Sequence, residues 1–176
     1  MILSAFSLEG KVAVVTGCDT GLGQGMALGL AQAGCDIVGI NIVEPTETIE
    51  QVTALGRRFL SLTADLRKID GIPALLDRAV AEFGHIDILV NNAGVCRLGS
   101  FLDMSDDDRD FHIDINIKGV WNVTKAVLPE MIARKDGRIV MMSSVTGDMV
   151  ADPGETAYAL TKAAIVGLTK SLAVEY

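Results

Sequence analysis

Two side chains near the end of the chain have types and spacing suited to acid–base chemistry. Tyr158 and Lys162 are four residues apart, so on a helix they lie on one face. A free phenol has a pKa of about 10, too high for efficient proton transfer at neutral pH, and a nearby cation lowers that pKa. Ser143 and Ser144 stand upstream and can hold a substrate oxygen. Together these residues predict an acid–base device for an alcohol or a carbonyl. Taken alone, the pair favours the plainer interpretation of a lysine stem covering a half-buried tyrosine.

A glycine-rich turn near the start of the chain is the second chemical feature. Residues 16–23 read Thr-Gly-Cys-Asp-Thr-Gly-Leu-Gly and follow a short apolar run. Gly17 permits a tight turn, Gly21 lets the backbone approach a pyrophosphate, and Gly23 lets a helix pack close to a strand. The helix N-terminus then offers N–H groups to phosphates. The turn predicts a dinucleotide site; a tight turn without a ligand is the alternative.

Strand-like and helix-like segments alternate along the chain. Strands are expected at 11–16, 36–41, 59–63, 86–91 and 138–143, and helices at 26–33, 45–58, 69–83, 106–133 and 156–176. Such alternation predicts an α/β, Rossmann-type doubly wound parallel sheet in three α/β/α layers. Ligands are then expected at the carboxyl ends of the strands. No linker divides the chain, so residues 1–176 are interpreted as one domain.

Composition narrows the class of protein. The chain has 176 residues, is 49% hydrophobic and carries a net charge of −8, which argues against a nucleic-acid surface. No apolar run reaches the roughly 18 residues of a membrane span, and the N-terminus does not resemble a secretion signal. Cys18, Cys35 and Cys96 lack metal-like spacing, so we expect reduced thiols, no metal and a cytoplasmic protein.

Three motifs occur together in a fixed order. Thr-Gly-x-x-x-Gly-x-Gly at 16–23, Asn-Asn-Ala-Gly at 91–94 and Tyr158-x-x-x-Lys162 resemble the classical short-chain dehydrogenase/reductase family, and the resemblance covers the whole chain. It implies reversible hydride transfer between a nicotinamide and a secondary alcohol or ketone. The residues that match the family's catalytic positions are Asn116, Ser144, Tyr158 and Lys162. One extra residue in the serine–tyrosine interval leaves Ser143 as the alternative to Ser144.

The resemblance also implies a role for each residue. Tyr158 is the general acid/base, and Lys162 lowers its pKa and holds the nicotinamide ribose. Ser144 orients the substrate oxygen. Asn116 holds a water that links Lys162 to solvent, although it could instead satisfy a helix kink. The implied cofactor contacts are Gly17, Thr20, Gly21, Leu22, Gly23, Asn41, Asp65, Leu66, Asn92, Ala93, Gly94, Tyr158 and Lys162.

The selection between NAD and NADP depends on the residue at the end of the second strand. A carboxylate there binds the ribose diol of NAD and repels a phosphate, whereas an arginine favours NADP. This chain has Asn41 with no basic residue close by, and Thr20 precedes Gly21 in the loop. We therefore expect NAD as the cofactor. Asn41 itself lacks the negative charge that would reject NADP. Asp65 fits an adenine contact and a turn aspartate equally well.

The two halves resemble different family members. Residues 1–94 are similar to bacterial 2-deoxy-D-gluconate (keto-deoxygluconate) dehydrogenases, and the remainder to another bacterial short-chain oxidoreductase. A chimera joined within 86–94 is one hypothesis, and a sugar acid or polyol is the expected substrate class. The family's sixth and seventh strands do not follow residue 176, so we expect a truncated sheet of order 3-2-1-4-5 with an open edge. The helices at 106–133 and 156–176 are expected to form a homo-oligomer interface. The alternative function is an inactive, self-associating Rossmann module that only binds dinucleotide.

Overall fold

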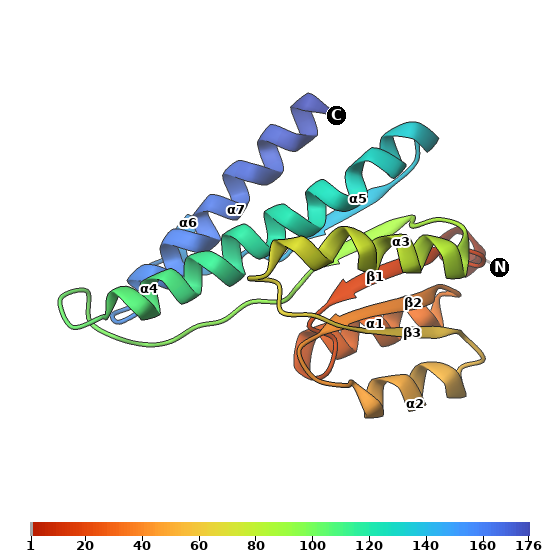
Figure 1. Cartoon of the computed structure of the whole chain (residues 1–176), viewed down its shortest axis with the longest axis horizontal. Coiled ribbons are helices and arrows are strands. Elements are labelled where there is room, and N and C mark those ends of the chain that lie inside the picture. The colour runs from red at the N-terminus through yellow and green to blue at the C-terminus, as the bar shows by residue number, and fades with distance from the viewer. Residues whose placement is uncertain (1) are drawn as a thin grey trace.

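A parallel sheet of five strands, with helices on both faces, positions the candidate residues (Figure 1). The computed structural model describes residues 2–176, apart from the side chains of Ile2, Leu3 and Ile69. The strands are β1 (Val12–Thr16), β2 (Asp36–Asn41), β3 (Phe59–Thr63), β4 (Ile88–Asn91) and β5 (Arg138–Met141). Their order is β3-β2-β1-β4-β5, as predicted, and every pairing is parallel.

The helices follow the predicted alternation, with different bounds. They are η1 (Ile2–Phe6), α1 (Gly21–Gln32), α2 (Thr46–Ala54), η2 (Ile69–Gly71), α3 (Ile72–Phe83), α4 (Asp106–His112), η3 (Ile113–Gly119), α5 (Val120–Arg134), α6 (Val145–Asp148) and α7 (Thr156–Glu175). The sequence prediction began α1 at residue 26, too late, because the glycines of its first turns hide the helical pattern. It carried α2 to residue 58, too far, because Gly56 turns the chain with φ +75°.

The predicted long helix over 106–133 contains an irregular turn. Ser105 caps α4 by accepting a hydrogen bond from Asp108 N at 3.1 Å, and acidic residues occupy the first turn, where they suit the helix dipole. The middle segment, η3, is a π-helix. Turns of this kind occur frequently at functional sites, and Asn116 lies in this one.

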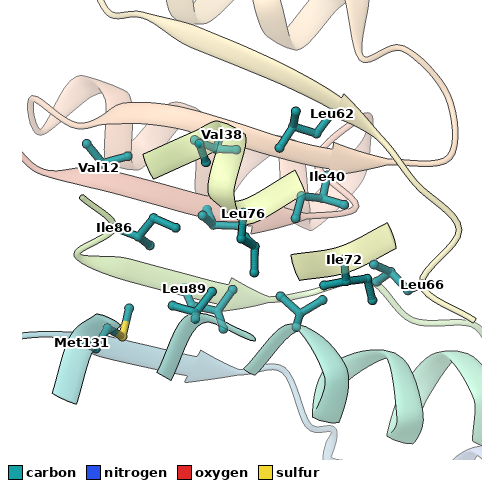
Figure 2. Packing of buried hydrophobic residues seen from close by; sticks show 14 residues of the cluster. Val12, Val38, Ile40, Leu62, Leu66, Ile72, Leu76, Ile86, Leu89 and Met131 are labelled. Carbon is teal, nitrogen blue, oxygen red and sulfur yellow. The ribbon is translucent and has the colours of Figure 1, made fainter. Parts of the chain in front are cut away.

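Apolar side chains pack against both faces of the sheet. On one face, Val38, Ile40 and Leu89 meet α3 and α5, which contribute Leu76 and Met131 among others (Figure 2). On the other face, the strands pack against α1 and α2. The continuous β-branched runs of β1 and β2 are buried on both faces, as is typical of parallel sheets. The three cysteines are free thiols.

The far edge of the sheet is more open. Residues of β5 alternate between exposed and half-buried, unlike those of β1. Beside it, a groove of about 700 Å³ separates the last turns of α5 and α7. By length and composition alone, α7 could cross a membrane, since an 18-residue window of this 20-residue helix has a mean hydropathy of 1.2. A single such helix is weak evidence, and here α7 packs against β5, α4 and η3.

Candidate active site

The glycine turn joins β1 to α1 at the carboxyl edge of the sheet. Gly17 and Gly21 have φ of +65° and +59°, which favours glycine at both positions. A Cβ on Gly23 would lie 1.9 Å from the carbonyl oxygen of Gly17, so no side chain fits there. At Gly21 a Cβ would meet nothing within 4 Å. The turn therefore holds α1 close to its strand and leaves open space over Gly21.

Hydrogen bonds attach this turn to the segment after β4. The Asn92 amide donates to the carbonyl oxygens of Thr16 at 3.1 Å and Gly17 at 2.8 Å. In return, the Thr16 hydroxyl oxygen accepts from the N–H groups of Asn92 and Ala93, both at 3.0 Å. Two motifs more than 70 residues apart thus form one rigid wall.

A cleft of about 410 Å³ opens along this wall. Nearly all the predicted cofactor residues line it: Gly17, Thr20, Leu22, Gly23, Asn41, Asp65, Leu66, Asn92, Ala93 and Gly94. Gly21 belongs to the same turn but is not among the lining residues. Asp19, Ile42 and Val95 also contribute. The size, the glycine turn and the N-terminus of α1 fit an extended dinucleotide.

Asn41 and Asp65 both have partners within the protein. Asn41 is 3% exposed; its Oδ1 accepts from Cys18 N at 2.7 Å, and its Nδ2 donates to Cys18 Sγ at 3.6 Å. Asp65 accepts from the side chain and the N–H of Arg67. The Arg67 guanidinium lowers the pKa of Asp65 to about 2. Asp65 therefore has the turn role and also lines the cleft.

A smaller cleft of about 190 Å³ adjoins the first, because Leu22, Asn92, Gly94 and Val95 line both. Tyr158 and Lys162 form its far wall, with the Lys162 ammonium 5.6 Å from the centre of the phenol ring. Lys162 is only 6% exposed, and burial lowers the pKa of its ammonium. Both groups therefore line one cavity. The alternative, in which the lysine stem only covers the tyrosine, does not require such a cavity.

Asn116 reaches the same place from η3. Its amide accepts from Val95 N at 2.8 Å and donates to Val95 O at 2.9 Å and Thr161 Oγ1 at 3.0 Å. A Cβ on Gly94 would lie 3.3 Å from Asn116 Oδ1 and 3.4 Å from Lys162 Nζ. The amide thus fixes the segment after β4 against α7.

The two serines have different positions. Ser143 lines the small cleft and donates to the carbonyl oxygen of Lys162 at 2.8 Å. Ser144 is not among the lining residues; it caps α6 by accepting from Thr146 N at 3.2 Å. Tyr158, Lys162 and Asn116 are therefore brought together, whereas the predicted Ser144 lies one residue beyond the cleft wall.

Several contributing residues were not singled out from the sequence. Thr161 bonds Asn116 and donates to Tyr158 O at 2.8 Å, and its only sequence signal is its place inside the Tyr-x-x-x-Lys motif. Asp19 lies inside the glycine turn, and the spacing of the glycines gives no signal for it. Cys96 lines the small cleft with no distinguishing pattern. Among the described residues, no group of histidine, cysteine or carboxylate side chains is arranged to hold a metal ion.

Comparisons with known proteins agree with this geometry. A family described as short chain dehydrogenase matches residues 11–176. Two Escherichia coli K12 proteins are similar over most of the chain. Oxidoreductase UcpA is 67% identical over 170 residues, which cover 96% of this chain and 65% of that protein. The 2-dehydro-3-deoxy-D-gluconate 5-dehydrogenase is 65% identical over 180 residues, which cover 100% and 70%.

Solved structures share the fold. A carveol dehydrogenase from Mycobacterium avium in complex with NAD superposes with a TM-score of 0.90 at 34% identity, covering 96% of this chain and 66% of that one. The chain thus spans about two thirds of the length of the curated relatives it matches.

Proposed function

The chain belongs to the short-chain dehydrogenase family, and from that premise we propose that it is an oxidoreductase acting on a secondary alcohol or ketone. One observation carries the proposal. Tyr158 and Lys162 line a cleft that continues into the larger cleft over the glycine turn. An acid–base pair beside a dinucleotide-sized site is the arrangement that a nicotinamide-dependent reaction needs.

The proposed cofactor is NAD. Gly17, Thr20, Gly21, Leu22 and Gly23 would hold its phosphates at the N-terminus of α1, while Asp65, Leu66 and the Asn92–Gly94 segment would contact the remainder. No Lys or Arg is among the residues that line the larger cleft, so a second phosphate has no counter-charge there. The carveol dehydrogenase binds NAD, which supports this assignment. When bound, the nicotinamide supplies the hydride acceptor.

The residues of the chain itself supply the proton chemistry. The phenol oxygen of Tyr158 takes the hydroxyl proton of the alcohol, or returns it to the oxygen of the ketone. The Lys162 ammonium stabilises the phenolate form through its positive charge. Asn116 keeps Gly94 and Val95 against α7, so the two clefts stay joined. A water held on η3 would link Lys162 to solvent.

Ser144 remains the proposed orienting serine for a chemical reason. A substrate oxygen needs a hydrogen-bond donor, and Ser143 already donates its hydroxyl hydrogen to Lys162 O. Ser144 only accepts, from Thr146 N, so its hydrogen is uncommitted. Ser144→Ala should therefore lower turnover more than Ser143→Ala. The reverse order would assign the role to Ser143.

The decisive experiment combines binding with turnover. Calorimetry with NAD and with NADP tests the cofactor site, and NADH formation is followed with a panel of sugar acids and secondary alcohols. Tyr158→Phe should reduce turnover about 100- to 10,000-fold, because it removes the acid/base group.

The chain offers a matched control for this variant. Tyr176→Phe makes the same chemical change at the other tyrosine, which is exposed at the end of α7, and should leave turnover unchanged. Equal rates for wild type and Tyr158→Phe would exclude the proposed catalysis. Dinucleotide binding without any turnover would favour the alternative, a module that only binds.

We also propose a substrate class, an oligomeric assembly and a cellular location. The sugar-acid dehydrogenase among the relatives supports a sugar acid or a similar polyol. Exposed apolar side chains on α5 and α7, including Trp121, Ile132 and Leu160, support homo-oligomer formation through these helices. Buried free thiols support a reducing, cytoplasmic location. Light scattering tests the assembly.

A chimera joined within 86–94 also stays a proposal. Two different relatives match nearly the whole chain at almost equal identity, as a joined sequence would. Comparing residues 1–94 and 95–176 separately with both relatives should then give a different best match for each part. The coding sequence and an intact mass provide the direct check, and a single natural gene would exclude the hypothesis.

A further inference from the structure

The side chain at the end of β2 has a structural role. In a sheet of this kind, a carboxylate at that position usually recognises the adenosine ribose. Here the position is Asn41, and both ends of its amide are bonded to Cys18, at 2.7 Å and 3.6 Å. Asn41 is buried, with only 3% of the residue exposed. Asn41 therefore fixes the glycine turn and contributes no charge to the cleft.

The same bonds place the next residue, Asp19. Cys18 is further held by Thr48, whose hydroxyl donates to Cys18 O at 2.7 Å, and Gly17 N donates to Ile40 O at 2.9 Å. This part of the turn is therefore attached to the end of β2 and to α2. Asp19 is half-buried and lines the larger cleft together with Asn41 and Ile42. A carboxylate thus stands beside the end of β2, supplied by the turn instead of the strand.

The charge of Asp19 is not neutralised within the protein. The other carboxylate of the cleft, Asp65, is paired with Arg67 at 2.6 Å. Across residues 2–176, no lysine, arginine or histidine side chain whose contacts are described forms an ion pair with Asp19. An unpaired carboxylate accepts hydrogen bonds from ribose hydroxyls and repels a phosphate on the same sugar.

We propose that Asp19 is the residue that makes this site select NAD over NADP. The inference rests on the proposed function, because it assumes that the larger cleft holds the adenosine half of a dinucleotide. It replaces the sequence interpretation, in which the site lacked any charge that rejects NADP. A competing role for Asp19 is purely structural: negative charge just before α1 stabilises that helix through its dipole.

Binding of nucleotide fragments separates these roles. The dissociation constants of 5′-AMP, adenosine 2′,5′-bisphosphate, NAD and NADP are measured by calorimetry for wild type, Asp19→Asn and Asp77→Asn. Asp77 is exposed on α3 and supplies the same change of charge away from the cleft. The ratio of the NADP and NAD constants should fall about tenfold in Asp19→Asn, and less at high salt, because a charge repulsion is removed. The fragment pair should change in the same sense, and Asp77→Asn should leave all ratios unchanged.

Three other outcomes would contradict the proposed role of Asp19. A changed melting temperature with an unchanged ratio in Asp19→Asn would assign the residue to helix stability and overturn this inference alone. A wild-type protein that prefers NADP would also overturn it. If wild type binds none of the four nucleotides, the proposed function fails, and this inference fails with it.

Discussion

The Lys162 ammonium donates a hydrogen bond of 2.7 Å to the main-chain carbonyl of Met142, just beyond the end of β5. The cation is thereby held at the carboxyl edge of the sheet, beside the phenol of Tyr158 and away from bulk water. Burial is the cause of its lowered pKa. Keeping the Lys162 ammonium charged in this buried position therefore lowers the stability of the folded protein.

This cost predicts the pH dependence of a Lys162 variant. Above its lowered pKa, the native state binds fewer protons than the unfolded chain, so stability rises with pH up to the ordinary value of 10.5. The destabilisation is fully present below the lowered pKa. Lys162→Met has no such proton, so the stability of wild type relative to Lys162→Met should increase from neutral to alkaline pH. Urea unfolding at several pH values measures this difference, and a constant difference would contradict it.

The close approach of α1 to its strand predicts the effect of two glycine substitutions. Gly23→Ala places a methyl group 1.9 Å from Gly17 O, which must displace the turn and abolish dinucleotide binding. Gly25→Ala is the matched control in the same helix, because its Cβ would meet nothing within 4 Å. Gly25→Ala should raise the free energy of unfolding by about 0.5–1 kcal/mol and preserve binding. Calorimetry with NAD and thermal melting provide the two readouts; intact binding in Gly23→Ala would refute the packing argument.

The hydrogen bonds of the Asn116 amide predict that its removal lowers the free energy of unfolding substantially. Asn116→Ala leaves the N–H and C=O of Val95 without these partners, and should lower the free energy of unfolding by about 2–4 kcal/mol. Asn122, on α5, is a suitable control because its buried amide nitrogen has no hydrogen-bond partner among the described residues. Asn122→Ala should therefore cost less than about 1 kcal/mol. Chemical denaturation measures both; similar losses for the two variants would show that the Val95 bonds contribute little.

At the opposite edge of the sheet, Asp87 links distant segments. It accepts from Arg134 at 2.7 Å, Val12 N at 2.9 Å and Lys11 at 3.1 Å, and its side chain is only 4% exposed. Burial alone raises the pKa of Asp87, but the hydrogen bonds from Arg134, Val12 and Lys11 outweigh it, and the pKa lies below 3.8.

Asp87→Asn should therefore destabilise the protein by about 1–2 kcal/mol at neutral pH, because it removes the charge from the hydrogen bonds with Lys11 and Arg134, which are part-exposed and each also pair with a second carboxylate. The stabilisation from a depressed pKa is present above 3.8 and is lost as pH falls through the folded value. The loss of wild-type stability in acid should thus be smaller in Asp87→Asn. Asp77→Asn should change stability by less than about 0.5 kcal/mol. Unfolding curves from pH 7 to pH 3 test this, and a parallel acid profile in Asp87→Asn would contradict it.

The sequence by itself determined the class of fold and indicated which residues are available for a site. Short apolar runs rich in β-branched residues, such as 12–16, predict buried strands, and their alternation with helices predicts a parallel sheet. The order β3-β2-β1-β4-β5 followed from the resemblance to the short-chain dehydrogenase/reductase family, and the structure has this order. The glycine turn and the Tyr158–Lys162 spacing are local patterns, and local geometry was sufficient to locate them.

Tertiary structure decided how those residues are used. Asn41 is bonded to Cys18 across 23 residues. Of the two carboxylates that line the cleft, Asp65 is paired with Arg67, whereas Asp19 has no ion pair among the described residues. Asn116 lies in a π-helix and bonds Val95, and Ser143 lies nearer to the small cleft than the pattern suggested. A sequence pattern shows which groups are available. Only the folded chain decides which of them are already paired, because a hydrogen bond between distant segments leaves no trace in local spacing.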